Sequence, residues 1–294
     1  MRESSRSQGS PKPRRFLGLE LAGAKNQKTA LATLEYYPRE KKIFLLDVYD
    51  RIAGHDEQSS DEALMETISA ATEGGAQATV MAVNVPLTLP PCLTCSRRTC
   101  PAPGKCSHPA SRWMREIARK HAVKGRARPF TPYTQRPVEL WVRYQVFPQL
   151  PPEAQFEIDE TLGGNKAPLT ARMIYLKKYL NDLTLIETWP KLTIALLAAQ
   201  MSLPKRVIAR YRQLEEGAHA RGTILDALSK EHGIFIYDRD HKKLSFGLAS
   251  FDAFVCAYSA LLSDTGRCAP LPRGFPKASG WIEYPALSVH NPKA

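Results

Sequence analysis

Three strand-like runs close together near the start of the chain constrain the fold more than any other feature. The runs cover residues 16–22, 30–37 and 43–50 and are rich in apolar and aromatic residues. A short turn at 23–29 and a tight connection at 38–42 join them. A parallel crossover needs a dozen residues or more, so connections this short join antiparallel neighbours. The sequence therefore predicts a three-stranded antiparallel meander.

A helix and a buried strand are expected after the meander. Residues 59–73 place apolar side chains at helical spacing behind a serine cap, and residues 78–86 are almost wholly apolar, as in a buried central strand. Later segments predict helices at 109–121, 168–180, 192–201, 204–216, 221–231 and 251–262, strands at 183–190 and 280–285, and either type at 138–147. This order predicts an α/β fold whose mixed sheet has three antiparallel strands, then parallel strands, flanked by helices.

The positive charge of the chain is concentrated in two stretches. The formal net charge is +12, and residues 92–143 alone carry twelve Lys and Arg against Glu116 and Glu139. Aromatic residues are interleaved there: Trp113, Phe130, Tyr133, Trp141 and Tyr144. A basic segment with aromatic side chains is typical of a surface that holds a single-stranded polyanion, so we expect nucleic acid as a partner. The alternative is a solvated helix face, and the basic stretch at 1–15 reads more simply as a solubilising tail.

Length and hydropathy predict one large domain. Residues 1–14 read as a disordered basic arm, and 15–290 as a single domain with a Cys-rich basic insert at about 90–145 and a helical insert at about 200–232. A hydrophobic content of 43% excludes a mainly disordered chain. No run approaches the roughly 18 apolar residues of a membrane span, and no secretory signal is evident. We therefore expect a cytoplasmic protein without a membrane partner; no protein partner can be inferred.

Four cysteines lie within fifteen residues: Cys92, Cys95, Cys100 and Cys106. Their spacing, C-x2-C-x4-C-x5-C, is typical of a structural zinc site, and the surrounding prolines and glycine make a loop that cannot bury a core of its own. Four thiolates also suit an iron–sulfur cluster, which stays an alternative. His108 can replace one sulfur as a ligand. Two disulfides are a further alternative, disfavoured by a cytoplasmic setting.

Polar residues at the ends of apolar elements are the candidates for chemistry. The predicted element order is that of the ribonuclease-H-like fold, in which carboxylates on the first strand, the fourth strand and later elements converge on a divalent metal. The matching positions hold Glu20, Asn84, Glu187 and Asp252. An unpaired acid inside an apolar strand is costly, so Glu20 favours a functional role. Asp252 alone has a simpler explanation as a first-turn acid of its helix.

Six short motifs follow one another in a fixed order along residues 16–285. They are GLELAGAKNQKTALATLE (18–35), VNVPLTLP (83–90), PLTARMIYL (168–176), IETWP (186–190), FDAFVCAYSALL (251–262) and GWIEYP (280–285). In this order they resemble the predicted ribonuclease-H-like nucleases grouped as domain of unknown function 429. The resemblance implies a ribonuclease-H-like fold and a suspected metal-dependent nuclease.

The resemblance also implies roles for individual residues. Glu20, Asn84, Glu187 and Asp252 would be catalytic, and the three acids among them would hold Mg²⁺ or Mn²⁺. The family usually has aspartate at the first two of these positions. Glutamate is longer by one C–C bond, ~1.5 Å, and asparagine lacks one negative charge, so both changes should weaken an octahedral magnesium site.

Three functions follow from these features. The first is a metal-dependent nuclease that hydrolyses phosphodiester bonds of DNA or RNA, with Lys25, Lys28 and Arg172 contacting phosphate. The alternative is a nucleic-acid-binding protein with the same fold and no efficient catalysis. A nucleotide-dependent phosphotransferase is less favoured, because the turn AGAKNQKT (22–29) is only vaguely similar to a phosphate-binding loop.

Overall fold

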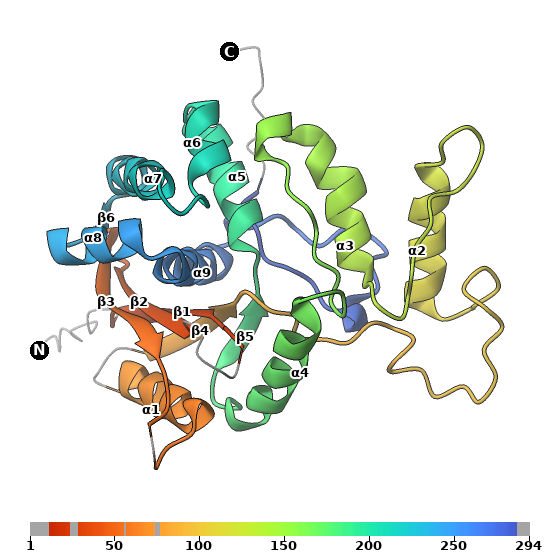
Figure 1. The fold of residues 1–294 in the computed structure, drawn as a ribbon, viewed down its shortest axis with the longest axis horizontal. Helices are drawn as coiled ribbons and strands as arrows, with labels where there is room; N and C mark the ends of the chain where they lie inside the picture. Colours follow the sequence, from red (N-terminus) through yellow and green to blue (C-terminus); the bar gives the residue numbers. More distant parts are fainter. Residues whose placement is uncertain (1–11, 24–28, 56, 74–76, 287–294) are drawn as a thin grey trace, which may run out of the picture.

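One mixed sheet organises the described part of the chain. The computed structural model describes residues 12–23, 29–55, 57–73 and 77–286. The sheet has six strands in the order β5-β4-β1-β2-β3-β6 (Figure 1). The strands are β1 (Arg14–Glu20), β2 (Thr29–Tyr37), β3 (Lys42–Ile52), β4 (Gln77–Val83), β5 (Thr184–Glu187) and β6 (Ile234–Phe235).

The strand pairings confirm the expected mixture of directions. β1 and β3 both run antiparallel to β2, so the first three strands form the predicted meander. β4 is parallel to β1, and β5 is parallel to β4. The two-residue strand β6, which the sequence analysis missed, pairs in parallel with β3 at the other edge. The carboxyl ends of β1, β4 and β5 therefore meet at one end of the sheet.

Helices cover both faces of the sheet. The helices of the described residues are α1 (Ser60–Thr72), α2 (Pro109–Lys120), α3 (Pro137–Trp141), α4 (Lys166–Leu176), α5 (Pro190–Gln200), α6 (Lys205–Arg210), α7 (Gly217–His232), α8 (Asp238–Phe246) and α9 (Leu248–Asp264), and not all of them lie on the sheet. Side chains of α1 and α4 form a core with one face, while α5, α7, α8 and α9 build the core on the other face (Figure 1).

Gly18 allows α9 to lie directly on β1. A Cβ atom at this position would stand 2.1 Å from the carbonyl oxygen of Ala253 and 2.1 Å from the amide nitrogen of Ala257, so only glycine fits. Helix α9 is apolar on nearly all sides and buried from Ser250 to Leu262. The close approach fixes the first turns of α9 beside the end of β1, which matters for the site described below.

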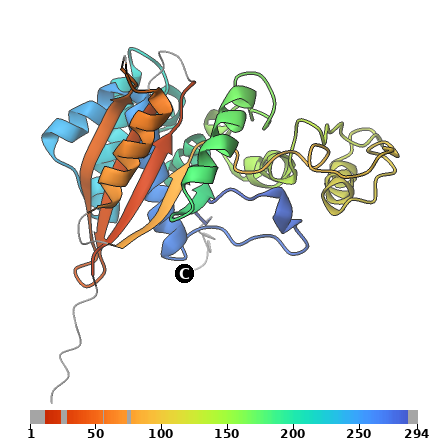
Figure 2. The same ribbon diagram turned by 90° about the horizontal axis from the view of Figure 1, so that it is seen from below.

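An arm projects from the body between β4 and α3, and Figure 2 shows it extending away from the sheet. It comprises residues 92–132 and contains α2. Its ends adjoin, because the amide of Cys92 donates to the carbonyl of Pro132 over 3.0 Å. Met114 and Ile117 of α2 pack against Leu140 in a small cluster separate from the cores on the sheet.

Several predicted elements differ from the observed ones. The segment that fitted helix or strand is helical, with α3 continuing into a π-helical turn, Val142–Val146. The helix predicted at 204–216 is shorter, because α6 ends at Arg210. The predicted closing strand at 280–285 forms only isolated bridges, Glu283 with Thr188 and Pro285 with Cys268. Arg14, placed in the disordered arm by the sequence analysis, begins β1, and α8 was missed.

Among the helices described, none is alone long and apolar enough to cross a bilayer. Together α8 and α9 reach that length and composition, but a bend of 113° separates them, and α9 is buried in the core.

Candidate functional site

Glu20, Asn84 and Asp252 come together where β1 and β4 end. Phe16 packs on the α9 face of β1, and strand alternation places Glu20 on the same face. Asn84 follows β4, and its Nδ2 atom donates to Oε2 of Glu20 over 2.7 Å. Asp252, near the start of α9, is close enough for its charge to act on Glu20. Three of the four predicted catalytic residues thus converge, although they lie far apart in the sequence.

The ionised form of Glu20 is disfavoured in this setting. Burial and then the negative charge of Asp252 raise the pKa of Glu20 to about 7, although Lys166, the Asn84 amide and Arg212 act in the opposite direction. A carboxyl group in such a place titrates near neutral pH. The sequence analysis singled out Glu20 on this physical ground, because an acid in an apolar strand is costly to ionise.

Asp252 is paired with an arginine. Its carboxylate is 2% exposed and accepts hydrogen bonds from Nη1 of Arg212, at 2.8 Å to Oδ2 and 3.2 Å to Oδ1. Burial raises the pKa of Asp252, and Arg212, Lys191 and Lys166 oppose that effect. Arg212 lies between α6 and α7, in a segment where the sequence offers no signal that separates it from neighbouring basic residues.

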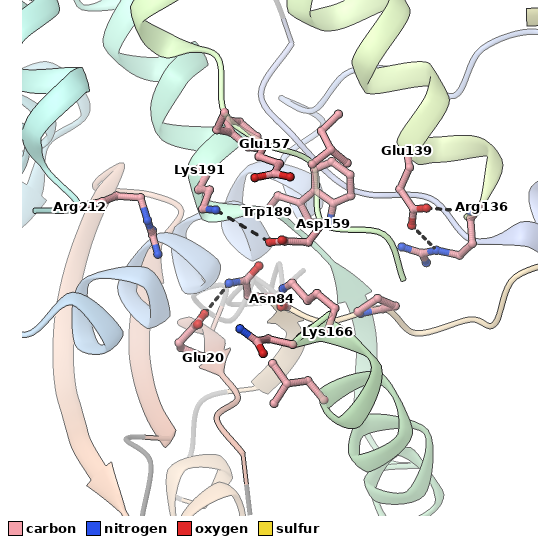
Figure 3. Close-up of a pocket in the computed structure, with 15 residues that line it drawn as sticks. Glu20, Asn84, Arg136, Glu139, Glu157, Asp159, Lys166, Trp189, Lys191 and Arg212 are labelled. Atoms are coloured by element: carbon pink, nitrogen blue, oxygen red, sulfur yellow. Dashed lines mark hydrogen bonds and ion pairs between the residues drawn. The ribbon is translucent and has the colours of Figure 1, made fainter. Parts of the chain in front are cut away.

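A cavity of about 240 Å³ opens beside Glu20 and Asn84, and Figure 3 shows charged side chains around it. The basic ones include Lys166 at the start of α4, Lys191 at the start of α5, and Arg212; Arg136, described below, also lines the cavity. The Nζ atom of Lys166 donates to the carbonyl of Asn84 over 2.9 Å. Burial, then the charge of Arg212, lowers the pKa of Lys191, and Lys166 adds to that effect. The sequence analysis missed all three lysines and arginines, although Lys191 directly follows the IETWP motif.

Glu187 does not join the other acids. Its carboxylate is buried and receives two hydrogen bonds from Arg136, 2.7 Å from Nη1 and 2.6 Å from Nη2. The amide of Leu87 donates to it as well, over 3.1 Å. In the register of the sheet, Glu187 stands beside Val83, whose side chain packs in the core on the α1 and α4 face. Glu187 therefore points away from the face that carries Glu20.

Arg136 is fully buried and also contacts Glu139 at the start of α3, with 3.1 Å from Nε to Oε1. Burial raises the pKa of Glu139, which the charge of Arg136 opposes. The basic stretch counted in the sequence thus includes one arginine that belongs to the core. Its aromatic residues are divided in the same way: Trp113 and Trp141 pack against each other at 6.3 Å, whereas Tyr133 is 54% exposed.

Of the three predicted phosphate-binding residues, the structure describes Arg172 alone, and its guanidinium is bound within the protein. Arg172 is bound to Oδ1 of Asp61, at 2.6 Å from Nη2, and to the carbonyl of Ala22, also at 2.6 Å. These contacts tie α4 to α1 and to the end of β1, away from the cavity. Lys25 and Lys28 lie outside the described residues, as does most of the turn at 22–29.

The four cysteines of the arm are free thiols. Burial raises the pKa of Cys92, with further contributions from Cys100, Cys106 and Cys95, so the four thiols lie within electrostatic range of one another. They are not assembled as a ligand set, and the predicted zinc site stays a prediction. Metal analysis together with a visible absorption spectrum would distinguish zinc from an iron–sulfur cluster.

The site where β1 and β4 end holds too few acids for a divalent cation of the kind that the family resemblance implied. Within the residues that the structure describes, no three His, Cys, Asp or Glu side chains stand close enough to hold a metal ion. In addition, two of the acids are already paired: Arg136 binds the carboxylate of Glu187, and Arg212 binds that of Asp252. The residues present do not fit the three-acid centre that the family resemblance implied.

Comparison of the chain with models of protein families, with curated proteins and with solved structures gives no match.

Proposed function

We propose that this chain is a nucleic-acid-binding protein with a ribonuclease-H-like sheet and no efficient metal-dependent catalysis. The single observation that carries the proposal is the charge of the projecting arm. Its exposed Lys and Arg residues are nine: Arg97, Arg98, Lys105, Arg112, Arg119, Lys120, Lys124, Arg126 and Arg128. Glu116 is the only acid within residues 92–132. A protruding, strongly basic surface is the electrostatic footprint of a partner with a phosphate backbone.

The state of the acids supports the second half of the proposal. Glu187 is saturated by Arg136 and a backbone amide, and Asp252 is paired with Arg212. A two-metal mechanism needs carboxylates free to bind cations. The strand order, three antiparallel strands followed by two parallel ones beside β1, supports the ribonuclease-H-like part.

A binding experiment tests the proposal through its salt dependence. Fluorescence anisotropy would be measured on labelled single- and double-stranded DNA and RNA from low to high salt. In a variant with Arg119, Lys120 and Arg126 replaced by Ser, we expect about tenfold or greater loss of affinity and, for duplex DNA, a salt slope reduced by roughly 3. The matched control replaces three exposed residues by Ser: Arg39 and Lys41 in the turn between β2 and β3, and Lys42 at the start of β3. Equal losses in both variants, or no binding by the unmodified protein, would contradict the proposal.

Phosphodiester cleavage is a second candidate, favoured by the meeting of Glu20 and Asp252 beside the cavity. Labelled substrates would be incubated with Mg²⁺, Mn²⁺ or EDTA, comparing the unmodified protein with Asn84→Asp and Asp252→Ala. Cleavage that Asp252→Ala abolishes would support this candidate. Binding without cleavage, even at high Mn²⁺, would support the first one.

A further inference from the structure

Arg212 contacts one acid of the site, Asp252, and lines the same two cavities as the other, Glu20. Its Nη1 atom binds the carboxylate of Asp252, and its charge also acts on the carboxyl group of Glu20. The two acids belong to different elements, β1 and α9, which Gly18 holds in close contact. One guanidinium therefore serves a pair of carboxylates whose charges repel each other.

Arg212 also stands between two cavities. Together with Glu20 it lines the cavity of about 240 Å³ and a second, larger one of about 890 Å³. Asp252 lines the larger cavity, together with Gly247 and Ser250. The side chain of Arg212 is 35% exposed, in contrast to the 2% of Asp252. An ordinary internal salt bridge would be sealed on both sides, whereas this one is reached from open space.

The charges of Glu20, Asp252 and Arg212 indicate what the site can bind. A carboxylate at the end of β1 and another in the first turns of α9 form a place that attracts a cation, and hard divalent cations prefer such oxygens. Arg212 brings a positive charge on a side chain attached to a separate segment, between α6 and α7. A guanidinium stays protonated at any working pH, so it neutralises the pair without depending on the metal supply.

We propose that the guanidinium of Arg212 is the resident cation of the Glu20–Asp252 pair and that it fills the place of a divalent metal ion in this chain. The inference concerns the site where β1 and β4 end, and it does not depend on what the arm binds. On this proposal the two acids are a cation site that the guanidinium of Arg212 already fills. Removal of one side chain, Arg212, should uncover it.

Titration with Mn²⁺ tests the proposal, with free Mn²⁺ followed by electron paramagnetic resonance. We expect the unmodified protein to show no Mn²⁺ site beside Glu20 and Asp252. Arg212→Ala should gain such a site, with an affinity for Mn²⁺ at least about tenfold higher than that of the unmodified protein, since a close charged pair is worth roughly 1.5 kcal/mol or more. Adding Asp252→Asn to Arg212→Ala should abolish the gained site. Arg210→Ala is the matched control, because Arg210 is an exposed neighbour paired with Glu216, and it should bind as the unmodified protein does.

Two results would overturn the proposal. The first is Mn²⁺ binding by the unmodified protein that Asp252→Asn removes, because the place would then not be filled by Arg212; this measurement needs no folded Arg212 variant. The second is a folded Arg212→Ala protein, verified by circular dichroism, that binds Mn²⁺ no better than the Arg210→Ala control. Should Arg212→Ala fail to fold, Arg212→Gln, which keeps a polar side chain, takes its place with the same expected gain.

Discussion

At the scale of the residue, the ionisation of Glu20 lowers the stability of the folded protein by an amount that depends on pH. Its pKa in the folded protein is about 7, raised above the ordinary 4.5 by burial and by Asp252, with Lys166, Asn84 and Arg212 in opposition. The folded state therefore holds this proton more tightly than the unfolded chain does. The contribution of Glu20 to the free energy of unfolding is greatest below the ordinary pKa of a glutamate. This contribution falls as the pH rises from about 4.5 to about 7, because the folded state must then release the proton.

The variant Glu20→Gln removes this cost. Compared with the unmodified protein, we expect its free energy of unfolding to be higher by roughly 1–3 kcal/mol at pH 8 and nearly unchanged at pH 4. Urea denaturation across this pH range measures both. Glu40→Gln, in the exposed turn between β2 and β3, is the control and should show no such trend. A Glu20→Gln protein less stable at pH 8 than at pH 4, relative to the unmodified chain, would show that the sign is wrong.

Arg136 forms two fully enclosed ion pairs, one with Glu187 and one with Glu139. Replacing Arg136 by Met leaves two buried carboxylates, Glu187 and Glu139, without their cation, so we expect a loss of about 3–5 kcal/mol in the free energy of unfolding. Urea denaturation measures it. The control, Arg143→Met, changes a half-buried arginine in the following π-helical turn and should cost far less. Equal costs would mean that the two pairs contribute nothing special.

The sequence predicted some of these residues and not others for physical reasons. Glu20 and Asp252 are recognisable because an acid in an apolar segment needs an explanation. The position of Glu187 was not predictable, since Leu185 and Ile186 are both apolar and the strand's alternation leaves its phase unreadable. Arg212 has no local signal at all. Its role exists only because the segment after α6 passes over the end of β1.

At the scale of the element, the contact between α9 and β1 decides whether the acids meet. The apolar runs of α9 and β1 were both predictable from the sequence, but the role of Gly18 as the point of contact was not. The elements that were missed, β6 and α8, have weak patterns of their own: β6 has two residues, and α8 is largely polar. Tertiary packing, rather than local preference, determines both.

Substitution of Gly18 by Ala tests the contact. Its Cβ atom would overlap backbone atoms of Ala253 and Ala257, so α9 must move away from β1. We expect a loss of about 1–3 kcal/mol or more in the free energy of unfolding, as in overpacked cores, measured by urea denaturation. Gly222→Ala in α7 is the matched control: its Cβ would meet Ser245 and His241 only at ordinary contact distances, 3.5 and 3.6 Å, so helix propensity should make it stabilising. A neutral Gly18→Ala would contradict this account.

At the scale of the whole molecule, the sheet with its helices and the basic arm are separable in structure and charge. The arm begins and ends at adjoining points, Cys92 and Pro132, and its small cluster around Met114 stands apart from the cores on the sheet. Residues 93–131 contain ten Lys and Arg and one acid, so without them the formal net charge of +12 falls to +3. Most of the excess charge of the protein therefore lies in the projecting arm.

Replacing residues 93–131 by a short Gly–Ser linker tests this division of labour. We expect the shortened protein to unfold cooperatively, at a somewhat lower temperature because α2 no longer covers Leu140, and to bind oligonucleotides at least about 100-fold more weakly at 0.1 M salt with a much flatter salt dependence. Calorimetry and anisotropy measure the two effects separately. Retained binding by the folded, shortened protein would contradict a role of the arm. It would point instead to the cavity where β1 and β4 end, which Lys166, Lys191 and Arg212 help to line.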